Sequence, residues 1–367
     1  MPNPLARLSE LGQSVWYDYI RRDLVRDGTL DRLIAEDKLA GMTSNPAIFQ
    51  KAIAKSDLYD DDIRAADRSL DVEALFEKIA VAEIRDAADR FRPVFDATDG
   101  RDGYVSLEVS PRLAHDTDGT IDAARRLWSA CDRPNVMIKI PGTAAGLPAI
   151  EACLLEGINI NVTLLFGIER YREVMERWLR ALERRAAAGD PIDHVASVAS
   201  FFVSRVDSLV DDTIEGKDSL ASYKSKLGIA NARLAYEAWE EAVQDAPRFH
   251  ALKEKGARVQ RPLWASTSTK DPALPNDYYV EALIGEETVN TMPPQTYEDY
   301  RENGDPEARV KHDLDDARAA FAALEGAGID FQALTRQLED EGVKKFADAY
   351  DGLLKSIEEK RAEIEAS

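Results

Sequence analysis

The residues VMIKIPGTAAGLPAI at 136–150, followed by INVTLLF at 160–166, decide the fold. Each stretch contains a short apolar run, which is typical of a strand buried on both faces of a parallel sheet. Similar short apolar segments alternate with longer amphipathic ones along most of the chain. This alternation predicts parallel strands that are joined by helices.

Eight candidate strands follow from this pattern, at Val15–Ile20, Ala40–Ser44, Tyr104–Val109, Val136–Ile140, Ile160–Leu165, Val195–Val203, Leu263–Ser266 and Thr288–Thr291. Eight strands that alternate with helices in a chain of this length predict an α/β fold, a closed (β/α)8 TIM barrel. The alternative is an open doubly wound sheet, but no G-x-G-x-x-G motif follows the first strand.

The chain is expected to form a single domain, because no linker rich in proline or serine divides residues 1–367. Extra helices are expected at both ends. An N-terminal helix is predicted within residues 1–13, and a helical extension occupies 306–367. Within this extension we expect helix stops near Gly326–Gly328 and near Gly342, because glycine is common at helix ends.

The composition excludes several classes of function. The chain has 68 acidic and 47 basic residues, a net charge of −21, so nucleic acid and anionic membranes are poor partners. No apolar run of about 18 residues predicts a spanning helix. With two cysteines and no export signal, a cytoplasmic protein is expected. No Cys/His cluster has the spacing of a metal site, so no metal is predicted. The oligomeric state, monomer or homodimer, stays open.

Most of the predicted strands carry a polar residue near their C-terminal end, where barrels of this kind place their active sites. The residues are Asp18, Asn45, Glu108, Lys139, Asn161, Thr163, Ser200 and Ser266. Lys139 is the most informative. Val136, Ile138 and Ile140 share one face of its strand, so Lys139 points into the barrel if these three face the helices.

An inward lysine has two interpretations. It can pair with an inward carboxylate, or its free amine can attack a carbonyl to form a Schiff base. The carboxylates of Asp18 and Glu108 suit either one, as proton carriers or as counter-charges. The amide and hydroxyl groups of the other strand ends suit sugar hydroxyls, but each can equally cap a helix. Arg205 and Lys270 are the cations available for a phosphate, and a surface ion pair is the alternative for Arg205.

Several motifs together resemble transaldolase: GMTSNPAIF at 41–49, VSLEVSP at 105–111, VMIKIPGTAAGLPAI at 136–150, INVTLLF at 160–166, ASFFVSRVDS at 199–208 and LWASTSTKDP at 263–272. The resemblance runs from Asp18 to NTMPP at 290–294. It implies a transferase without a cofactor, which moves a dihydroxyacetone unit from sedoheptulose 7-phosphate to glyceraldehyde 3-phosphate. The products would be erythrose 4-phosphate and fructose 6-phosphate, within the pentose phosphate pathway.

The resemblance also implies a role for each matching residue. Lys139 would form the Schiff base, and Asp18 would take the proton of the C4 hydroxyl. Glu108 and Thr163 would move protons through a water. The remaining positions match binding residues: Asn45, Asn161 and Ser200 for the hydroxyls, and Arg205 and Ser266 for the phosphate.

The chain departs from the family pattern at Ser268, where better-known members have a second arginine. Lys270 is the candidate to replace its charge, although an ammonium is a point charge and not a bidentate fork. In the family a C-terminal helix closes over the site. Phe346 is the candidate to reach it, with core packing as the favoured role. Two rival functions stay open, a class I sugar-phosphate aldolase and a catalytically dead barrel that serves as a structural module.

Overall fold

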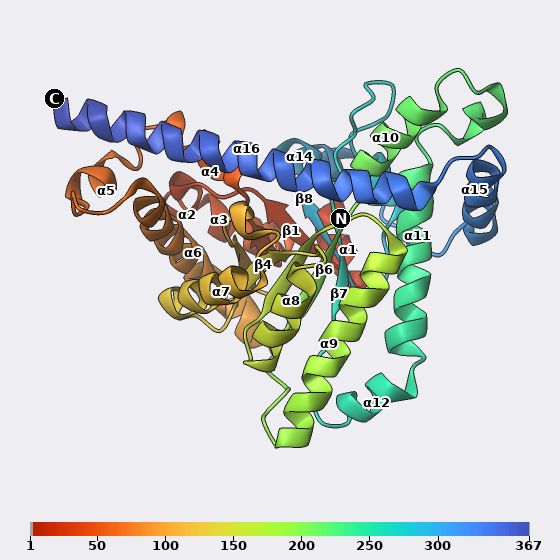
Figure 1. The fold of residues 1–367 in the computed structure, drawn as a ribbon, viewed down its shortest axis with the longest axis horizontal. Coiled ribbons are helices and arrows are strands. Elements are labelled where there is room, and N and C mark those ends of the chain that lie inside the picture. Colours follow the sequence, from red (N-terminus) through yellow and green to blue (C-terminus); the bar gives the residue numbers. More distant parts are fainter. Residues whose placement is uncertain (1–2, 367) are drawn as a thin grey trace.

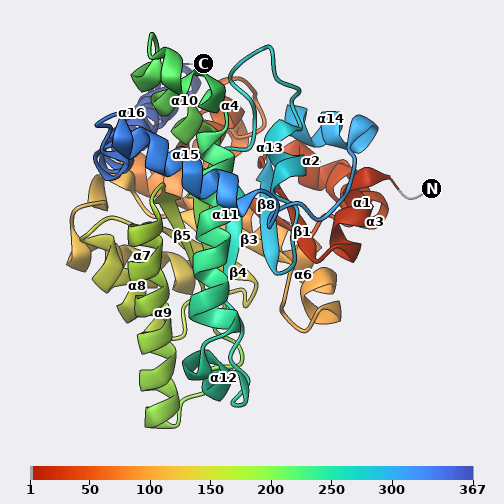
Figure 2. The ribbon, with the colours of Figure 1, turned by 90° about the vertical axis from the view of Figure 1, so that its right-hand side faces the viewer.

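The computed structural model describes residues 3–366, and within them eight parallel strands close into a barrel in sequence order. This confirms the predicted (β/α)8 fold, with helices around the outside (Figures 1 and 2). The strands are β1 Gln13–Asp18, β2 Gly41–Thr43, β3 Tyr104–Glu108, β4 Val136–Pro141, β5 Ile160–Leu165, β6 Ser197–Phe202, β7 Arg261–Ala265 and β8 Thr288–Met292.

The helices cover the barrel wall and extend beyond it. They are α1 Pro4–Glu10, α2 Arg22–Arg26, α3 Thr29–Asp37, α4 Pro46–Ala54, α5 Asp60–Ala65, α6 Val72–Ala97, α7 Thr117–Cys131, α8 Gly146–Leu155, α9 Ile168–Ala188, α10 Ser204–Ile214, α11 Leu227–Trp239, α12 Pro247–Lys253, α13 Tyr278–Ala282, α14 Pro294–Asn303, α15 Leu314–Gly326 and α16 Phe331–Ala366. Among residues 3–366, no helix has the length and apolar content needed to cross a membrane.

The observed strands overlap all eight predicted segments, but the first one begins and ends two residues earlier than predicted. It starts at Gln13, a polar residue that an apolar pattern does not include. The side chain of Gln13 is buried and donates hydrogen bonds to the carbonyl of Leu283 and to Thr288 Oγ1, at 2.9 and 3.0 Å. The amide nitrogen is therefore satisfied inside the wall of the barrel, while the amide oxygen is buried without a hydrogen-bond partner among the described residues.

Side chains of alternate strand residues fill the barrel interior, as the period of two requires. The middle of the barrel is apolar and fully buried, with Trp16, Met137, Val198, Leu263 and Val289 in one cluster. Gly41 is required on β2 because a Cβ there would lie 2.6 Å from ring atoms of Trp16. The absent side chain makes room for the indole ring.

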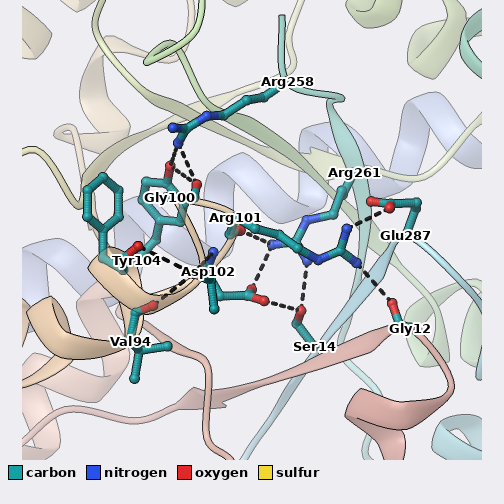
Figure 3. A network of polar contacts seen from close by, with 12 residues as sticks. Gly12, Ser14, Val94, Gly100, Arg101, Asp102, Tyr104, Arg258, Arg261 and Glu287 are labelled. Atoms are coloured by element: carbon teal, nitrogen blue, oxygen red, sulfur yellow. Dashed lines mark hydrogen bonds and ion pairs between the residues drawn. The ribbon is translucent and has the colours of Figure 1, made fainter. Parts of the chain in front are cut away.

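A polar network closes the barrel at the amino-terminal ends of its strands (Figure 3). Arg261 pairs with Asp102 at 2.8 Å, with 4% and 10% of their side chains exposed. Arg261 also donates to Ser14 Oγ at 2.7 Å, and Ser14 donates to Asp102 at 2.8 Å. Each charge is thus compensated by a partner and by further hydrogen bonds, which is the arrangement a buried ion pair needs.

We expect the Asp102→Ala substitution to lower the free energy of unfolding by about 3–5 kcal/mol, because it leaves the Arg261 guanidinium buried without its counter-charge. Glu287→Ala is the matched control. It breaks the ion pair with Arg101 in the same network, but those side chains are 37% and 40% exposed, so the expected loss is only about 0–1 kcal/mol. Urea unfolding measures both variants. Equal losses would contradict this description of the network.

Helix α16 crosses the opposite end of the barrel as one uninterrupted helix of 36 residues (Figure 1), about 54 Å long. The predicted helix stop near Gly342 is therefore wrong. A Cβ at Gly342 would lie 3.0 Å from Leu164 Cδ2 of β5. The glycine lets α16 lie close to the strand ends, and this packing overrides its weak helix propensity.

The far part of α16 is fixed to helices on the other side of the barrel. Tyr350 donates a hydrogen bond to Glu73 of α6 at 2.8 Å, and Lys360 pairs with Asp60 of α5 at 2.9 Å. The helix is therefore held on both sides of the barrel opening.

Candidate active site

Lys139 lies at the C-terminal end of β4, beside the carboxylate of Glu108 on β3. The register of the two strands pairs the residues directly, and Lys139 Nζ lies 3.5 Å from Glu108 Oε2. Both side chains are buried, with 6% and 4% exposed. Nζ also donates a hydrogen bond of 3.3 Å to the carbonyl of Ser44, which follows β2. An amine is thus held among acceptors inside the barrel.

Asp18 ends β1, and its Oδ1 accepts a 2.7 Å hydrogen bond from Thr43 Oγ1 on β2. Thr43 in turn shares a 2.6 Å contact with Thr291 Oγ1 on β8. Burial raises the pKa of Asp18 above its usual range, and the charge of Lys139 and the Thr43 hydrogen bond oppose this only in part. This carboxyl group is suited to accept a proton.

Burial is also the largest effect on the pKa of Glu108. It raises this pKa to about 7, although the positive charge of Lys139 acts to lower it. Its two carboxylate oxygens lie buried without a hydrogen-bond partner among the described residues. Thr163 Oγ1, at the end of β5, is buried without a partner as well. A carboxyl group with a pKa near neutrality can both donate and accept a proton at physiological pH.

The pKa of Glu108 has a consequence for stability. Between pH 4.5, the ordinary pKa of a glutamate side chain, and about pH 7, the folded protein binds this proton while the unfolded chain releases it. The folded state therefore loses stability as the pH rises through this window. We expect Glu108→Gln to remove this pH dependence. The difference in unfolding free energy, variant minus wild type, should therefore be roughly 2–3 kcal/mol larger at pH 8 than at pH 4.5. Denaturant titrations across this range measure it, and a constant difference would contradict the assignment.

A series of hydrogen bonds links β6, β5 and β3 beside the lysine, since Asn161 is paired in register with Lys139. Ser200 Oγ on β6 donates to Asn161 Oδ1 at 2.7 Å, and Asn161 Nδ2 donates to Ser106 Oγ on β3 at 3.1 Å. All three side chains are buried. The series fixes the orientation of the Asn161 amide on the strand next to Lys139.

The residues predicted to bind phosphate lie at and beyond the C-terminal ends of β6 and β7. Arg205 lies in the first turn of α10, with its guanidinium carbon 5.2 Å from the ring centre of Phe202. Burial lowers the pKa of Arg205, and the charges of Asp18 and Glu108 oppose this. Ser266 follows β7 with a positive φ of 56°, and its hydroxyl lies 2.9 Å from that of Ser204. Lys270, farther along this loop, is exposed and donates to Ser268 Oγ at 2.8 Å.

Two predicted residues carry a structural role in addition to the one assigned to them. Asn45 Oδ1 accepts the backbone N–H of Ile48 at 3.0 Å and so caps α4. Phe346 packs in the core, as favoured, and also reaches the site, because its ring centre lies 5.7 Å from Lys139 Nζ and 5.9 Å from the guanidinium carbon of Arg205. These are cation–π distances.

Sequence reasoning missed several residues that contact the predicted site residues, namely Thr43, Ser44, Ser106 and Phe202, and it missed Thr291, which contacts Thr43. All five lie within the stretches of sequence quoted above. The period of two along β3 could have found Ser106, which shares a face with Glu108. Ser44 contributes its backbone carbonyl, for which a side chain gives no signal. Among residues 3–366, no three His, Cys, Asp or Glu side chains are grouped as a metal ion would require.

Fold and site together define a (β/α)8-barrel protein with a buried lysine and two carboxyl groups at the carboxyl-terminal end of the barrel. The sequence model described as "Transaldolase/Fructose-6-phosphate aldolase" matches residues 15–357, and the chain belongs to this family.

Individual relatives are similar along their whole length. A transaldolase from Frankia alni is 49% identical over 361 residues, which are 97% of each chain. A transaldolase from Thermobifida fusca is 48% identical over 366 residues, 99% of each chain. A transaldolase from Thiobacillus denitrificans is 47% identical over 354 residues, 95% of this chain and 98% of the relative.

Proposed function

We propose that the protein is a transaldolase, which transfers a dihydroxyacetone unit through a Schiff base on Lys139. The observation that carries this proposal is the amine of Lys139, buried at the barrel opening 3.5 Å from Glu108. The names of the relatives support it, since chains 47–49% identical over nearly their whole length are transaldolases.

The first step joins Lys139 to the donor, a ketose phosphate such as sedoheptulose 7-phosphate. The free amine attacks the C2 carbonyl, and the resulting carbinolamine loses water to form the iminium ion. This loss requires a proton for the departing hydroxyl. Glu108 is suited to supply it, because its pKa is about 7 and it lies beside the nitrogen. The unpartnered hydroxyl of Thr163 can orient the water that leaves and later returns.

The second step breaks the C3–C4 bond. Asp18 takes the proton of the C4 hydroxyl, C4 becomes the aldehyde carbon of erythrose 4-phosphate, and the bonding electron pair moves through C2 to the iminium nitrogen. The three-carbon unit remains on Lys139 as an enamine. Glyceraldehyde 3-phosphate then enters, the enamine carbon attacks its aldehyde, and Asp18 returns the proton. Hydrolysis of the iminium releases fructose 6-phosphate.

The remaining site residues are proposed to bind the substrate. Asn45, Asn161 and Ser200 offer amide and hydroxyl groups to the hydroxyls of the three-carbon unit. Arg205, Ser266 and Lys270 lie toward the phosphate end. Asn161 and Ser200 are buried, which strengthens their polar contacts because water does not compete with them. Lys139 is itself only 5% exposed under α16, which limits the access of water to the enamine.

A class I aldolase that releases dihydroxyacetone to water is the second candidate function, because the family name includes fructose-6-phosphate aldolase. Product analysis separates the two. With fructose 6-phosphate and erythrose 4-phosphate, a transaldolase forms sedoheptulose 7-phosphate and glyceraldehyde 3-phosphate. With fructose 6-phosphate alone, an aldolase releases free dihydroxyacetone continuously. A dead barrel does neither and gives no adduct on Lys139 when borohydride is added, which would overturn the proposal.

We also infer that the protein works in the cytoplasm on small sugar phosphates and not on nucleic acid. Its two cysteines, Cys131 and Cys153, are free and buried, as in proteins of reducing compartments. The net charge of −21 disfavours polyphosphate partners. Monomer and homodimer remain the two expected states, and light scattering distinguishes them.

A further inference from the structure

Three cations lie together at the phosphate end of the site, and they come from three separate segments. Arg205 lies in the first turn of α10, Lys270 lies in the loop after β7, and Lys345 belongs to α16. None of the three makes an ion pair with a described residue. In a chain with 68 acidic and 47 basic residues, three neighbouring cations that make no ion pair are unexpected.

The packing of α16 places Lys345 at this position. The next residue, Phe346, lies over both Lys139 and Arg205, at 5.7 and 5.9 Å. One turn earlier, Gly342 rests against Leu164 and Phe166. This turn of the helix is therefore fixed between β5 and α10, and the exposed side chain of Lys345 starts from it.

Electrostatics agree with this placement. After burial, the positive charges of Arg205 and Lys345 are the causes that lower the pKa of Lys270. Lys270 is thus close enough to each of the other two cations to be repelled by it. The neighbouring Lys344 differs, because it pairs with Asp348 at 2.6 Å on the surface of the same helix. This repulsion is unfavourable, and the attraction of a dianion to the cations would offset it.

We propose that Lys345 is a third cation of the phosphate subsite, so that the C-terminal helix supplies the charge that a second arginine supplies elsewhere in the family. The inference rests on the proposed function, because it assumes a phosphorylated sugar in this site. The ammonium groups of Lys270 and Lys345 would then together replace one guanidinium group. Ammonium groups attract a phosphate without fixing its orientation, since they are point charges on flexible stems.

The test compares Lys345→Gln with Lys344→Gln, which removes the adjacent charge on the same helix. For Lys345→Gln we expect the KM for fructose 6-phosphate to rise on the order of tenfold, with kcat changed by less than about twofold, since a lost charge-assisted contact weakens binding of ground state and transition state alike. The kcat/KM for unphosphorylated fructose should not change. Lys345→Arg keeps the positive charge and should keep the wild-type KM. Lys344→Gln should have the wild-type KM and kcat.

A binding measurement separates this inference from the proposed function. Inorganic phosphate should raise the Tm of wild type and of Lys344→Gln more than that of Lys345→Gln, and high salt should reduce the difference. If the Tm differences appear but the wild type has no transferase activity, the proposed function fails and the anion site stands. If Lys345→Gln and Lys344→Gln behave alike in both KM and Tm, the inference is wrong.

Discussion

Lys139→Met is expected to reduce turnover by at least about 10⁴-fold and to abolish the borohydride adduct, while the barrel remains folded. Methionine keeps the length and apolar character of the side chain but provides no nucleophilic nitrogen. The Glu108 carboxyl group loses its counter-charge in this variant, and at neutral pH it can remain protonated, since its pKa is about 7 even beside the lysine. The variant therefore avoids an unpaired buried charge, and its fold should survive.

Lys51→Met is a suitable control, because Lys51 is exposed on α4 and lies outside the site. Steady-state rates, circular dichroism and intact mass after borohydride reduction are compared for both variants. Substantial turnover by folded Lys139→Met, or an adduct on another lysine, would show that Lys139 is not the nucleophile.

Asp18→Asn is expected to lower turnover by about 10²–10⁴-fold, because the C4 hydroxyl loses its proton acceptor. The asparagine carbonyl can still accept the Thr43 hydrogen bond, so the local geometry should be kept. Imine formation uses Lys139 and Glu108 and should continue. The adduct trapped from fructose 6-phosphate should therefore change, from a three-carbon unit in wild type to the intact six-carbon phosphate in the variant.

This change in adduct mass is more informative than the rate, since a general structural defect would reduce both adducts together. Asp102→Asn is the matched control, because Asp102 is a buried carboxylate at the other end of the barrel. It should destabilise the protein and leave the three-carbon adduct unchanged. A three-carbon adduct in Asp18→Asn, formed at the wild-type rate, would contradict the role proposed for Asp18.

The sequence predicts which side chains on the strands of the candidate site point into the barrel. Lys139 and Asn161 lie on strands whose alternation fixes which face is inward, and in the structure both side chains are buried inside the barrel. The contributions of α16 are harder to predict. Gly342 indicates a helix end when only its neighbours in sequence are considered, and its real role depends on contact with Leu164, about 180 residues away. Packing between distant segments has no local signal, so Phe346 could be proposed only through the family resemblance.

The two ends of the barrel differ in how their buried carboxyl groups are hydrogen-bonded. At the amino-terminal end, Arg261 and Asp102 have counter-charges and hydrogen bonds. At the other end, Glu108 and Thr163 keep buried oxygens without hydrogen bonds, a state that lowers stability. Evolution of a more heat-resistant variant would therefore meet a trade-off at the reactive end, where the most stabilising replacements also remove activity. The amino-terminal end and the outer helices are free of that conflict, so thermal tolerance and turnover can be selected at separate places in the same barrel.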